Sequence, residues 1–388
     1  MKRDLPGTGS GGAMERPTLS ERANRFWRRV TEGMELNEIW RQFEADARSS
    51  YRLYSKDVDA AQSAGESKVR RALHIAWQFL WSVLDKLTPG RRILLLLALV
   101  LLVLPVDWIW QSGANGNGPD FQFLAALLLL ALLIMEVGDR VVMKRDLQIA
   151  KEIQAWLLPA NPPQVPGLQI AFATRPANTV AGDYYDVFAR PGSAGDNPRF
   201  LIAIADVAGK SIPAAMLMAT FQASLKTLSD TPGPLTDLMA RINRYACSNS
   251  QNGRRFTTAF VAEYEPETRR MVYVNAGHNS PIVLRQSGAI ERLDVGGVPV
   301  GVMDEAPYAS GEVTLETGDW VAAFTDGVIE AENPREQQYG EDRLVTMLRW
   351  GGQLAPATLL QQILIDIDRF VERAPQHDDI TCILMRAV

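Results

Sequence analysis

The stretch LIAIADVAGKSIPAAMLMA, Leu201–Ala219, joins a short apolar run to a segment rich in Ala and Met. Its first charge is Asp206, at the end of the apolar run, and Gly209 and Lys210 follow in a turn-like segment. Taking a carboxylate out of water is costly unless it is paired, solvated or bound to a cation. The stretch therefore predicts a strand, a turn and a helix, with an acid whose position needs an explanation.

Three more strand-like segments carry an acid at one end. Asp183 precedes a strand in AGDYYDVF, Asp326 ends one in VAAFTDGVIEAEN, and Asp378 begins one in PQHDDITCILM. A single acid of this kind is more typical of a solvated turn or a helix cap. If the four ends converge, however, the carboxylates repel one another unless a cation lies among them. Oxygen ligands without clustered Cys or His favour Mg²⁺ or Mn²⁺ over zinc.

The part of the chain that holds these acids, residues 164–388, predicts an α+β fold. Strand-like runs cluster in its middle and helical runs come in pairs, which favours antiparallel sheets flanked by helices over a doubly wound parallel sheet. The predicted strands are 168–174, 200–206, 257–264, 270–277, 319–326 and 379–386. The predicted helices are Pro213–Leu228, Leu235–Ser248, Glu341–Trp350 and Pro356–Glu372.

Two apolar runs precede this domain, Ile93–Trp110 and Phe121–Val137, joined by the polar loop QSGANGNGPD. Each is short for a membrane span at about 1.5 Å per residue, and buried core helices are the alternative. Unbroken leucine runs without a polar face favour a two-helix transmembrane hairpin over residues 91–138. The loop has no Lys or Arg, whereas basic residues flank the pair on its outer ends: Arg91, Arg92, Arg140, Lys144 and Arg145. The positive-inside rule then predicts a two-pass protein of the inner (cell) membrane with both termini in the cytoplasm.

The remaining segments are a tail at 1–16, expected to be disordered, a helical region at 17–90 and a linker helix at 139–163. The helical region is either a small bundle or a set of amphipathic helices on the membrane surface. Residues 1–92 carry 17 Lys or Arg and 12 Asp or Glu, within a chain of net charge -5. Nucleic-acid binding is not expected, because these positive charges are interspersed with acids and no binding motif accompanies them. The two cysteines, Cys247 and Cys382, are expected to be free thiols.

An apolar stripe on the predicted linker helix consists of Val142, Ile149, Ile153 and Trp156, at spacings of seven, four and three. The stripe could pack on the following domain or pair with a second copy of itself, so a homodimer through this helix is one hypothesis. The prolines of LLPANPP end the helix.

Five motifs, AGDYYDVF, IADVAGKSIPAAMLMA, NAGHNSP, FTDGVIEAEN and HDDITCILM, occur in the order found in the metal-dependent PPM (protein phosphatase 2C-like) family. The chain resembles most closely the bacterial SpoIIE branch of that family, which takes part in sigma-factor regulation. The segment EIQAWLLPANPP is similar to the helix and turn before the catalytic domain of that branch. The resemblance covers Glu152–Val388 and does not extend to residues 1–150.

The resemblance implies an α-β-β-α sandwich of two antiparallel sheets, with two Mg²⁺ or Mn²⁺ ions at one end. Asp206 would bridge both ions, with the Val207 carbonyl on one of them. Asp326 and Asp378 would complete the shell of the other ion, and Asp183 would bind or orient metal-bound water. Phosphoserine or phosphothreonine would be hydrolysed by water that the two metals activate. The chain shows no convincing Ser/His/Asp or Cys/His arrangement, as such a mechanism predicts.

The sequence departs from the family pattern at three positions. Ala181 stands where the family has the first glycine of Gly-Gly-Asp, and Ala208 and Ser211 replace the serine and second glycine of DVSGKG. We expect Ser211 to alter the turn. Five residues are weaker candidates for supporting the metal ligands or binding phosphate: Gly209, Lys210, Arg175, His278 and Asp379.

By the resemblance, the chain is a membrane-anchored serine/threonine phosphatase that acts on a phosphorylated anti-sigma-factor antagonist, a small STAS-domain protein. Two alternatives remain open at this stage. One is a metal-dependent hydrolase of small phosphate esters, and the other is a catalytically silent membrane scaffold that binds the phosphoprotein or its kinase.

Overall fold

The computed structural model describes residues 81, 84–85, 87–103, 121–190, 198–249 and 255–388. The expected tail at 1–16, nearly all of the helical region at 17–90 and the loop between the apolar runs lie outside these residues. The chain divides into two compact units, Met1–Gly138 and Asp139–Val388.

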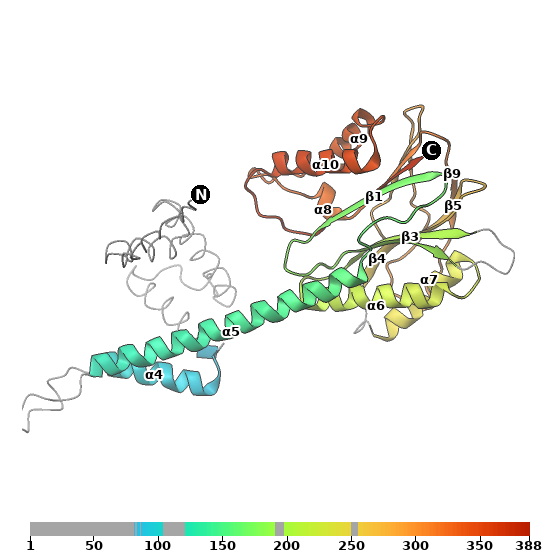
Figure 1. The fold of residues 1–388 in the computed structure, drawn as a ribbon. Helices are drawn as coiled ribbons and strands as arrows, with labels where there is room; N and C mark the ends of the chain where they lie inside the picture. Colours follow the sequence, from blue (N-terminus) through green and yellow to red (C-terminus); the bar gives the residue numbers. More distant parts are fainter. Residues whose placement is uncertain (1–80, 82–83, 86, 104–120, 191–197, 250–254) are drawn as a thin grey trace, which may run out of the picture. The chain divides into compact units, whose positions relative to one another are not determined.

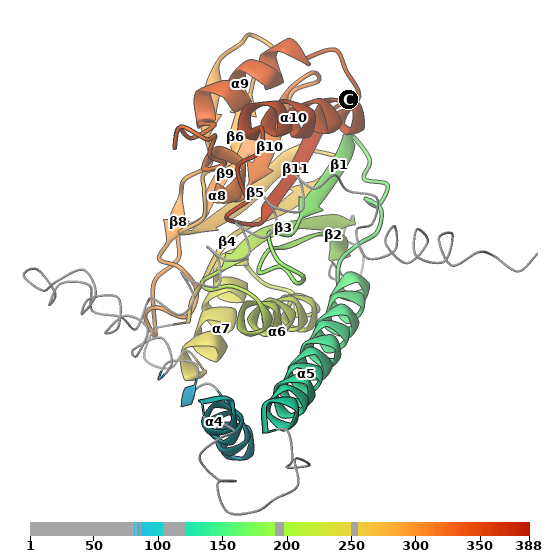
Figure 2. The ribbon, with the colours of Figure 1, turned by 90° about the vertical axis from the view of Figure 1, so that its left-hand side faces the viewer.

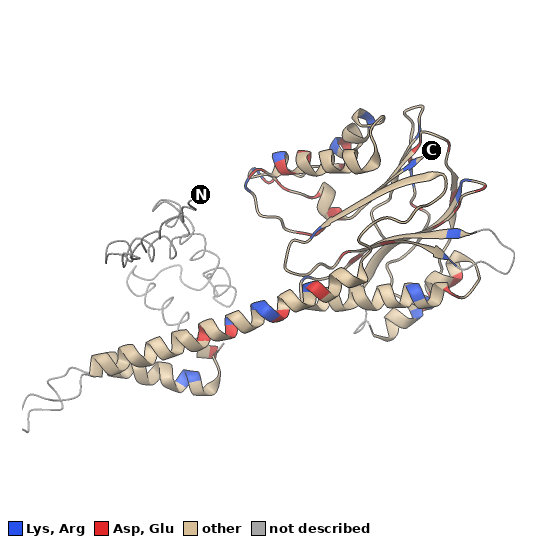
Figure 3. Cartoon of the chain, viewed as in Figure 1, with Lys and Arg blue, Asp and Glu red and all other residues tan. Residues whose placement is uncertain are grey.

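The described part of the first unit consists of α4 (Pro89–Val103) and the beginning of α5 (Phe121–Leu157). The two helices run side by side, with Ala98 and Ala125 buried (Figure 1). Figure 3 shows that the start of α5 carries no charged residue. In the sequence the first charged residue of this helix is Glu136. Of the described helices, only α5 is long and apolar enough to cross a membrane, judged by length and composition alone. The expected hairpin therefore stays a prediction.

The second unit is a sandwich of two sheets. In spatial order, sheet A contains β1 (Leu168–Arg175), β11 (Ile380–Ala387), β10 (Trp320–Phe324), β6 (Ile282–Leu284) and β7 (Ile290–Arg292). Sheet B contains β2 (Tyr184–Arg190), β3 (Arg199–Val207), β4 (Thr257–Glu265), β5 (Arg270–Ala276) and β8 (Gly296–Gly297), and β9 (Gly311–Thr314) also pairs with β5. The described pairs are antiparallel except for the short parallel contact of β5 with β8.

Strand β3 shows why the run LIAIA is apolar without interruption. Ile202 and Ile204 point into the core between the two sheets. Leu201, Ala203 and Ala205 point to the other face, toward helices α6 and α7. Side chains alternate between the faces of a strand, so a strand covered on both faces must be apolar at every position.

Two helix pairs cover the outer faces of the sandwich, as Figure 2 shows. Helices α6 (Ile212–Ser229) and α7 (Leu235–Ser248) contribute to the core on sheet B, whereas α9 (Glu341–Trp350) and α10 (Pro356–Val371) contribute to the core on sheet A. Along α10 the buried residues Leu359, Leu360, Ile363 and Ile367 form the one-sided stripe of a helix that covers a sheet. The expected α-β-β-α sandwich is thus confirmed.

Candidate metal centre

Antiparallel pairing brings the predicted acids together two by two. In sheet B, Tyr184 of β2 lies opposite Ala205 of β3, so Asp183, just before β2, comes beside Asp206. In sheet A, Phe324 of β10 lies opposite Cys382 of β11. Asp326 follows β10 at the start of the short helix α8 (Asp326–Ile329), and Asp378 precedes β11, so these two acids also come close.

The two pairs interact across the sandwich. Burial raises the pKa of Asp206 to about 7, and the negative charges of Asp326 and Asp378 add to the increase. Asp183 is almost fully buried, and its pKa is raised mainly by burial and next by Asp206. Burial and the charge of Asp378 also raise the pKa of Asp326. Like charges in a poorly solvated place disfavour ionisation, which is the electrostatic condition that a divalent cation relieves.

Asp379, a weaker candidate from the sequence, accepts two hydrogen bonds from the loop that leads to Asp183. Its Oδ1 accepts from the Ala177 amide at 2.7 Å, and its Oδ2 accepts from the Gly182 amide at 2.6 Å. Because Asp379 follows Asp378 directly, this contact ties the loop of one predicted ligand to the loop of another.

Gln154, which the sequence reading did not single out, holds the same loop from the side of α5. Its Nε2 donates to the Ala181 carbonyl at 2.7 Å, and its Oε1 accepts from the Ala181 amide at 2.9 Å. Gln154 is the only residue of the described part of α5 beyond Gly138 whose side chain is buried. A polar side chain inside the apolar face of EIQAWLL was the signal that could have identified it.

Thr325 was also missed. Its hydroxyl donates to Asp183 Oδ2 at 2.9 Å and accepts from the Thr381 amide at 3.0 Å. It is fully buried at the end of β10 and so joins sheet A to the first acid of sheet B. The sequence signal that could have identified Thr325 is its position directly before the predicted metal ligand Asp326.

Two glycines allow the backbone segments around the acids to approach closely. A Cβ on Gly327 would lie 2.0 Å from the Asp379 carbonyl oxygen, so no other residue fits between α8 and the start of β11. A Cβ on Gly182 would lie 3.3 Å from the Val207 carbonyl oxygen, which is the predicted backbone ligand. The turn after β3 needs a left-handed backbone twice, at Gly209 with φ 114° and at Ser211 with φ 66°.

The two candidate cations from the sequence, Lys210 and Arg175, are engaged with acidic groups. Lys210 Nζ lies 3.1 Å from Asp378 Oδ2, and it also donates to the His377 carbonyl. Arg175 Nη1 lies 2.5 Å from Asp368 Oδ1 on α10. Either group would have to leave its partner to bind a substrate phosphate.

His278 is buried and is linked to the backbone of Asp206 through Thr258, whose hydroxyl donates to the Asp206 carbonyl at 3.3 Å. Its amide donates to Asn275 Oδ1 at 2.7 Å, and its Nδ1 lies 3.0 Å from Thr258 Oγ1. Burial lowers its pKa to about 4. The side chain is therefore neutral near pH 7, and its contacts are those of a residue that stabilises the loop.

The donor chemistry fits a hard divalent cation. The four carboxylates and the Val207 carbonyl supply only oxygen atoms, and Asp183 and Asp206 are held in a place that disfavours their own charge. Within the described residues, no three His, Cys, Asp or Glu side chains are drawn together closely enough to form a metal-binding group. Asp206, Asp326 and Asp378 nevertheless lie within electrostatic range of one another.

Comparison with known proteins agrees with this site. Residues 196–388 match the family model described as Stage II sporulation protein E (SpoIIE). This part of the chain is therefore similar to the SpoIIE family. The resemblance inferred from the five motifs is therefore confirmed, and the matched residues include three of the four acids.

Two curated relatives extend the similarity upstream of the family match. Protein IcfG of Synechocystis sp. is 27% identical over 278 residues, which cover 65% of this chain and 43% of that protein. Phosphoserine phosphatase RsbU of Bacillus subtilis is 28% identical over 252 residues, which cover 64% of this chain and 72% of RsbU. The chain thus spans less than half the length of IcfG.

The fold of the second unit is shared with a solved protein domain. The SiaA-PP2C domain of Pseudomonas aeruginosa superimposes with a TM-score of 0.55 and 20% sequence identity. The match covers 64% of this chain and 99% of that domain.

Proposed function

We propose that this chain is a metal-dependent protein serine/threonine phosphatase. The observation that carries the proposal is the convergence of strand-end carboxylates from both sheets within electrostatic range of one another. Burial and neighbouring acids raise the pKa values of Asp183, Asp206 and Asp326. The match to the SpoIIE family model and the similarity to a protein named phosphoserine phosphatase support the same activity.

In this proposal Asp206, Asp326 and Asp378, with the Val207 carbonyl and Asp183, would hold two Mg²⁺ or Mn²⁺ ions. Such ions, when bound, polarise phosphoryl oxygens and make water a stronger nucleophile. The chain itself positions the ligands. Asp379 and Thr325 fix the loop and the orientation of Asp183 through their hydrogen bonds.

We further propose that the substrate is a phosphorylated anti-sigma-factor antagonist of the STAS type. This step rests on the SpoIIE branch and on the similarity to RsbU, and not on a contact in the structure. The chain would act on it from the cytoplasmic face of the membrane, anchored by the apolar start of α5 and the run before it.

The stripe on α5 supports the hypothesis of a homodimer through the linker helix. Its four residues are exposed: Val142 59%, Ile149 46%, Ile153 49% and Trp156 81%. Apolar side chains at these spacings on one helix are typical of a surface that a second helix covers.

The test is phosphate release from a phosphoserine protein by the fragment Asp139–Val388, which is a compact unit with its own cores. We expect release that requires Mn²⁺ or Mg²⁺ and stops with a chelator. Asp206→Asn should abolish it, whereas Asp230→Asn, at an exposed acid after α6, should leave it unchanged. A folded, metal-loaded fragment that releases nothing would favour the scaffold, and release only from small phosphate esters would favour the second alternative.

A further inference from the structure

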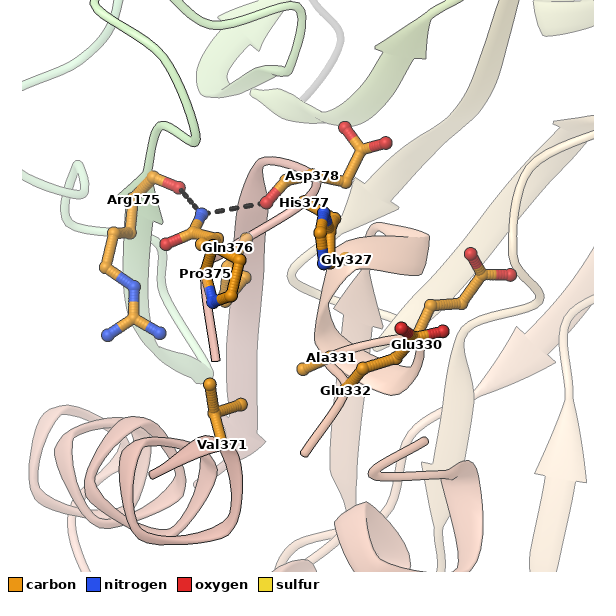
Figure 4. Close-up of a pocket in the computed structure, with 11 residues that line it drawn as sticks. Arg175, Gly327, Glu330, Ala331, Glu332, Val371, Pro375, Gln376, His377 and Asp378 are labelled. Atoms are coloured by element: carbon orange, nitrogen blue, oxygen red, sulfur yellow. Dashed lines mark hydrogen bonds between the residues drawn. The ribbon is translucent and has the colours of Figure 1, made fainter. Parts of the chain in front are cut away.

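A pocket of about 240 Å³ lies beside Asp378. Figure 4 shows Arg175 and Gln376 on one side of it and Glu330 and Glu332 on the other. Gln376 Nε2 donates to the carbonyls of Arg175 and Asp378, both at 2.8 Å. The pocket wall is therefore built on the same loop that presents a predicted metal ligand.

The pocket combines an apolar lining with unpaired acids. Four apolar residues contribute to the lining: Ala331, Val371, Pro375 and Ile380. Within the described residues, the carboxylates of Glu330 and Glu332 have neither a hydrogen-bond partner nor an ion-pair partner. Glu330 also lies within electrostatic range of Asp326 and Asp378.

The positive charges around the pocket are already balanced. The guanidinium of Arg175 is paired with Asp368, and Lys210 is paired with Asp378. The unbalanced charge of the pocket is therefore that of Glu330 and Glu332. A ligand that complements this lining has an apolar stem and a cationic end, which is the chemistry of a Lys or Arg side chain.

We propose that this pocket is a specificity subsite for a Lys or Arg side chain near the phosphorylated residue of the substrate. The proposal rests on the proposed phosphatase function and deepens it. The methylene stem lies on Val371 and Pro375, while the cation lies near Glu330 and Glu332. An acidic side chain at the same substrate position is repelled by both glutamates, so the pocket also selects against it.

The test uses the full chain in detergent micelles with Mn²⁺ and a set of phosphoserine peptides. The peptides carry Lys, Ala or Glu at successive positions on either side of the phosphoserine. At one position we expect kcat/KM to be about twofold to fivefold higher for Lys than for Ala, mostly through KM, as for a partly exposed ion pair. The preference should weaken as salt is raised.

Variants of the two glutamates test whether the preference for the Lys peptide arises in this pocket. The double variant Glu330→Gln with Glu332→Gln should remove it, and Glu332→Lys should shift it toward the Glu peptide. Glu267→Gln is the matched control, because Glu267 is an exposed acid in the β4–β5 turn, at the opposite end of sheet B from Asp206. The control should keep the preference of the unaltered chain.

Equal kcat/KM for Lys and Ala peptides at every position overturns the proposal, as does a preference that survives in the double glutamate variant. Absence of metal-dependent release from every peptide counts against the proposed function instead. In that case the pocket is tested by fluorescence anisotropy with labelled forms of the same peptides. Equal affinity for the Lys and Ala peptides then overturns the subsite.

Discussion

At Ser211 the backbone has φ 66° and ψ -146°, a combination that only glycine adopts without strain. The residue lies in the turn between Asp206 and α6, where the resemblance expects glycine. We predict that Ser211→Gly stabilises the domain by about 1 kcal/mol, because relief of strain exceeds the entropy that glycine loses on folding. The gain in stability is measured as the increase in the urea unfolding midpoint of the fragment Asp139–Val388.

Ser224→Gly is the control for this prediction. Ser224 lies inside α6, where glycine should destabilise by about 0.5 kcal/mol. If both substitutions destabilise the fragment, the backbone of Ser211 does not have a positive φ.

The burial of His278 leads to a prediction about how the free energy of unfolding depends on pH. Its folded-state pKa of about 4 is below the ordinary value of 6.5, so between these values the unfolded chain binds a proton that the folded chain does not. Its contribution to stability is therefore present above pH 6.5 and is lost as the pH falls toward 4. We expect the free energy of unfolding of the unaltered fragment to fall by about 2 kcal/mol more than that of His278→Gln between pH 7 and pH 5. Urea denaturation at the two pH values measures the difference, and equal falls would contradict the prediction.

At the scale of the element, the end of α5 is joined to the loop before Asp183 through Gln154. The amide makes both hydrogen bonds that the Ala181 backbone offers, two residues before Asp183. We predict that Gln154→Ala weakens Mn²⁺ binding about tenfold, as removal of a residue that orients a ligand does in other metal sites. Isothermal titration of the fragment with Mn²⁺ gives the affinity without relying on activity.

Gln148→Ala is the matched control for this effect, since Gln148 is an exposed glutamine on the same helix. It should leave Mn²⁺ affinity unchanged. If Gln154→Ala lowers the unfolding midpoint but not the Mn²⁺ affinity, Gln154 stabilises the fold without positioning Asp183.

At the scale of the whole molecule, the open question is how the chain is placed in the membrane. The apolar runs and their flanking charges predict two spans with the loop on the outer side. In a chain whose two cysteines are replaced, we expect Asn115→Cys to react with an impermeant maleimide added to intact cells. Ser287→Cys, between β6 and β7, should react only after the membrane is permeabilised.

Both positions reacting alike in intact cells would be inconsistent with the two-pass arrangement. Labelling of neither position before permeabilisation would indicate that the loop does not reach the outer side. A chain that is recovered in the soluble fraction without detergent would rule out the membrane anchor itself.

The sequence by itself determined those helices and strands whose apolar pattern extends over many residues. The apolar run of β3, the stripe of α10 and the helices Leu235–Ser248 and Glu341–Trp350 follow from local spacing, and the structure has both helices with the expected bounds. The sequence did not predict the short strands β6 to β9 or the four-residue helix α8, because segments of this length carry too few residues to show a period.

The four acids were recognisable from the sequence because each ends or begins an apolar strand. Their meeting depends on the strand register: β2 on β3 brings Asp183 to Asp206, and β10 on β11 brings Asp326 to Asp378. The supporting contacts of Gln154, Thr325 and Asp379, and the unpaired acids of the pocket, are decided only by the tertiary structure. The physical reason is that a hydrogen bond or a charge pair between residues far apart in the chain leaves no periodic signal, since its partners meet only when the two sheets have packed.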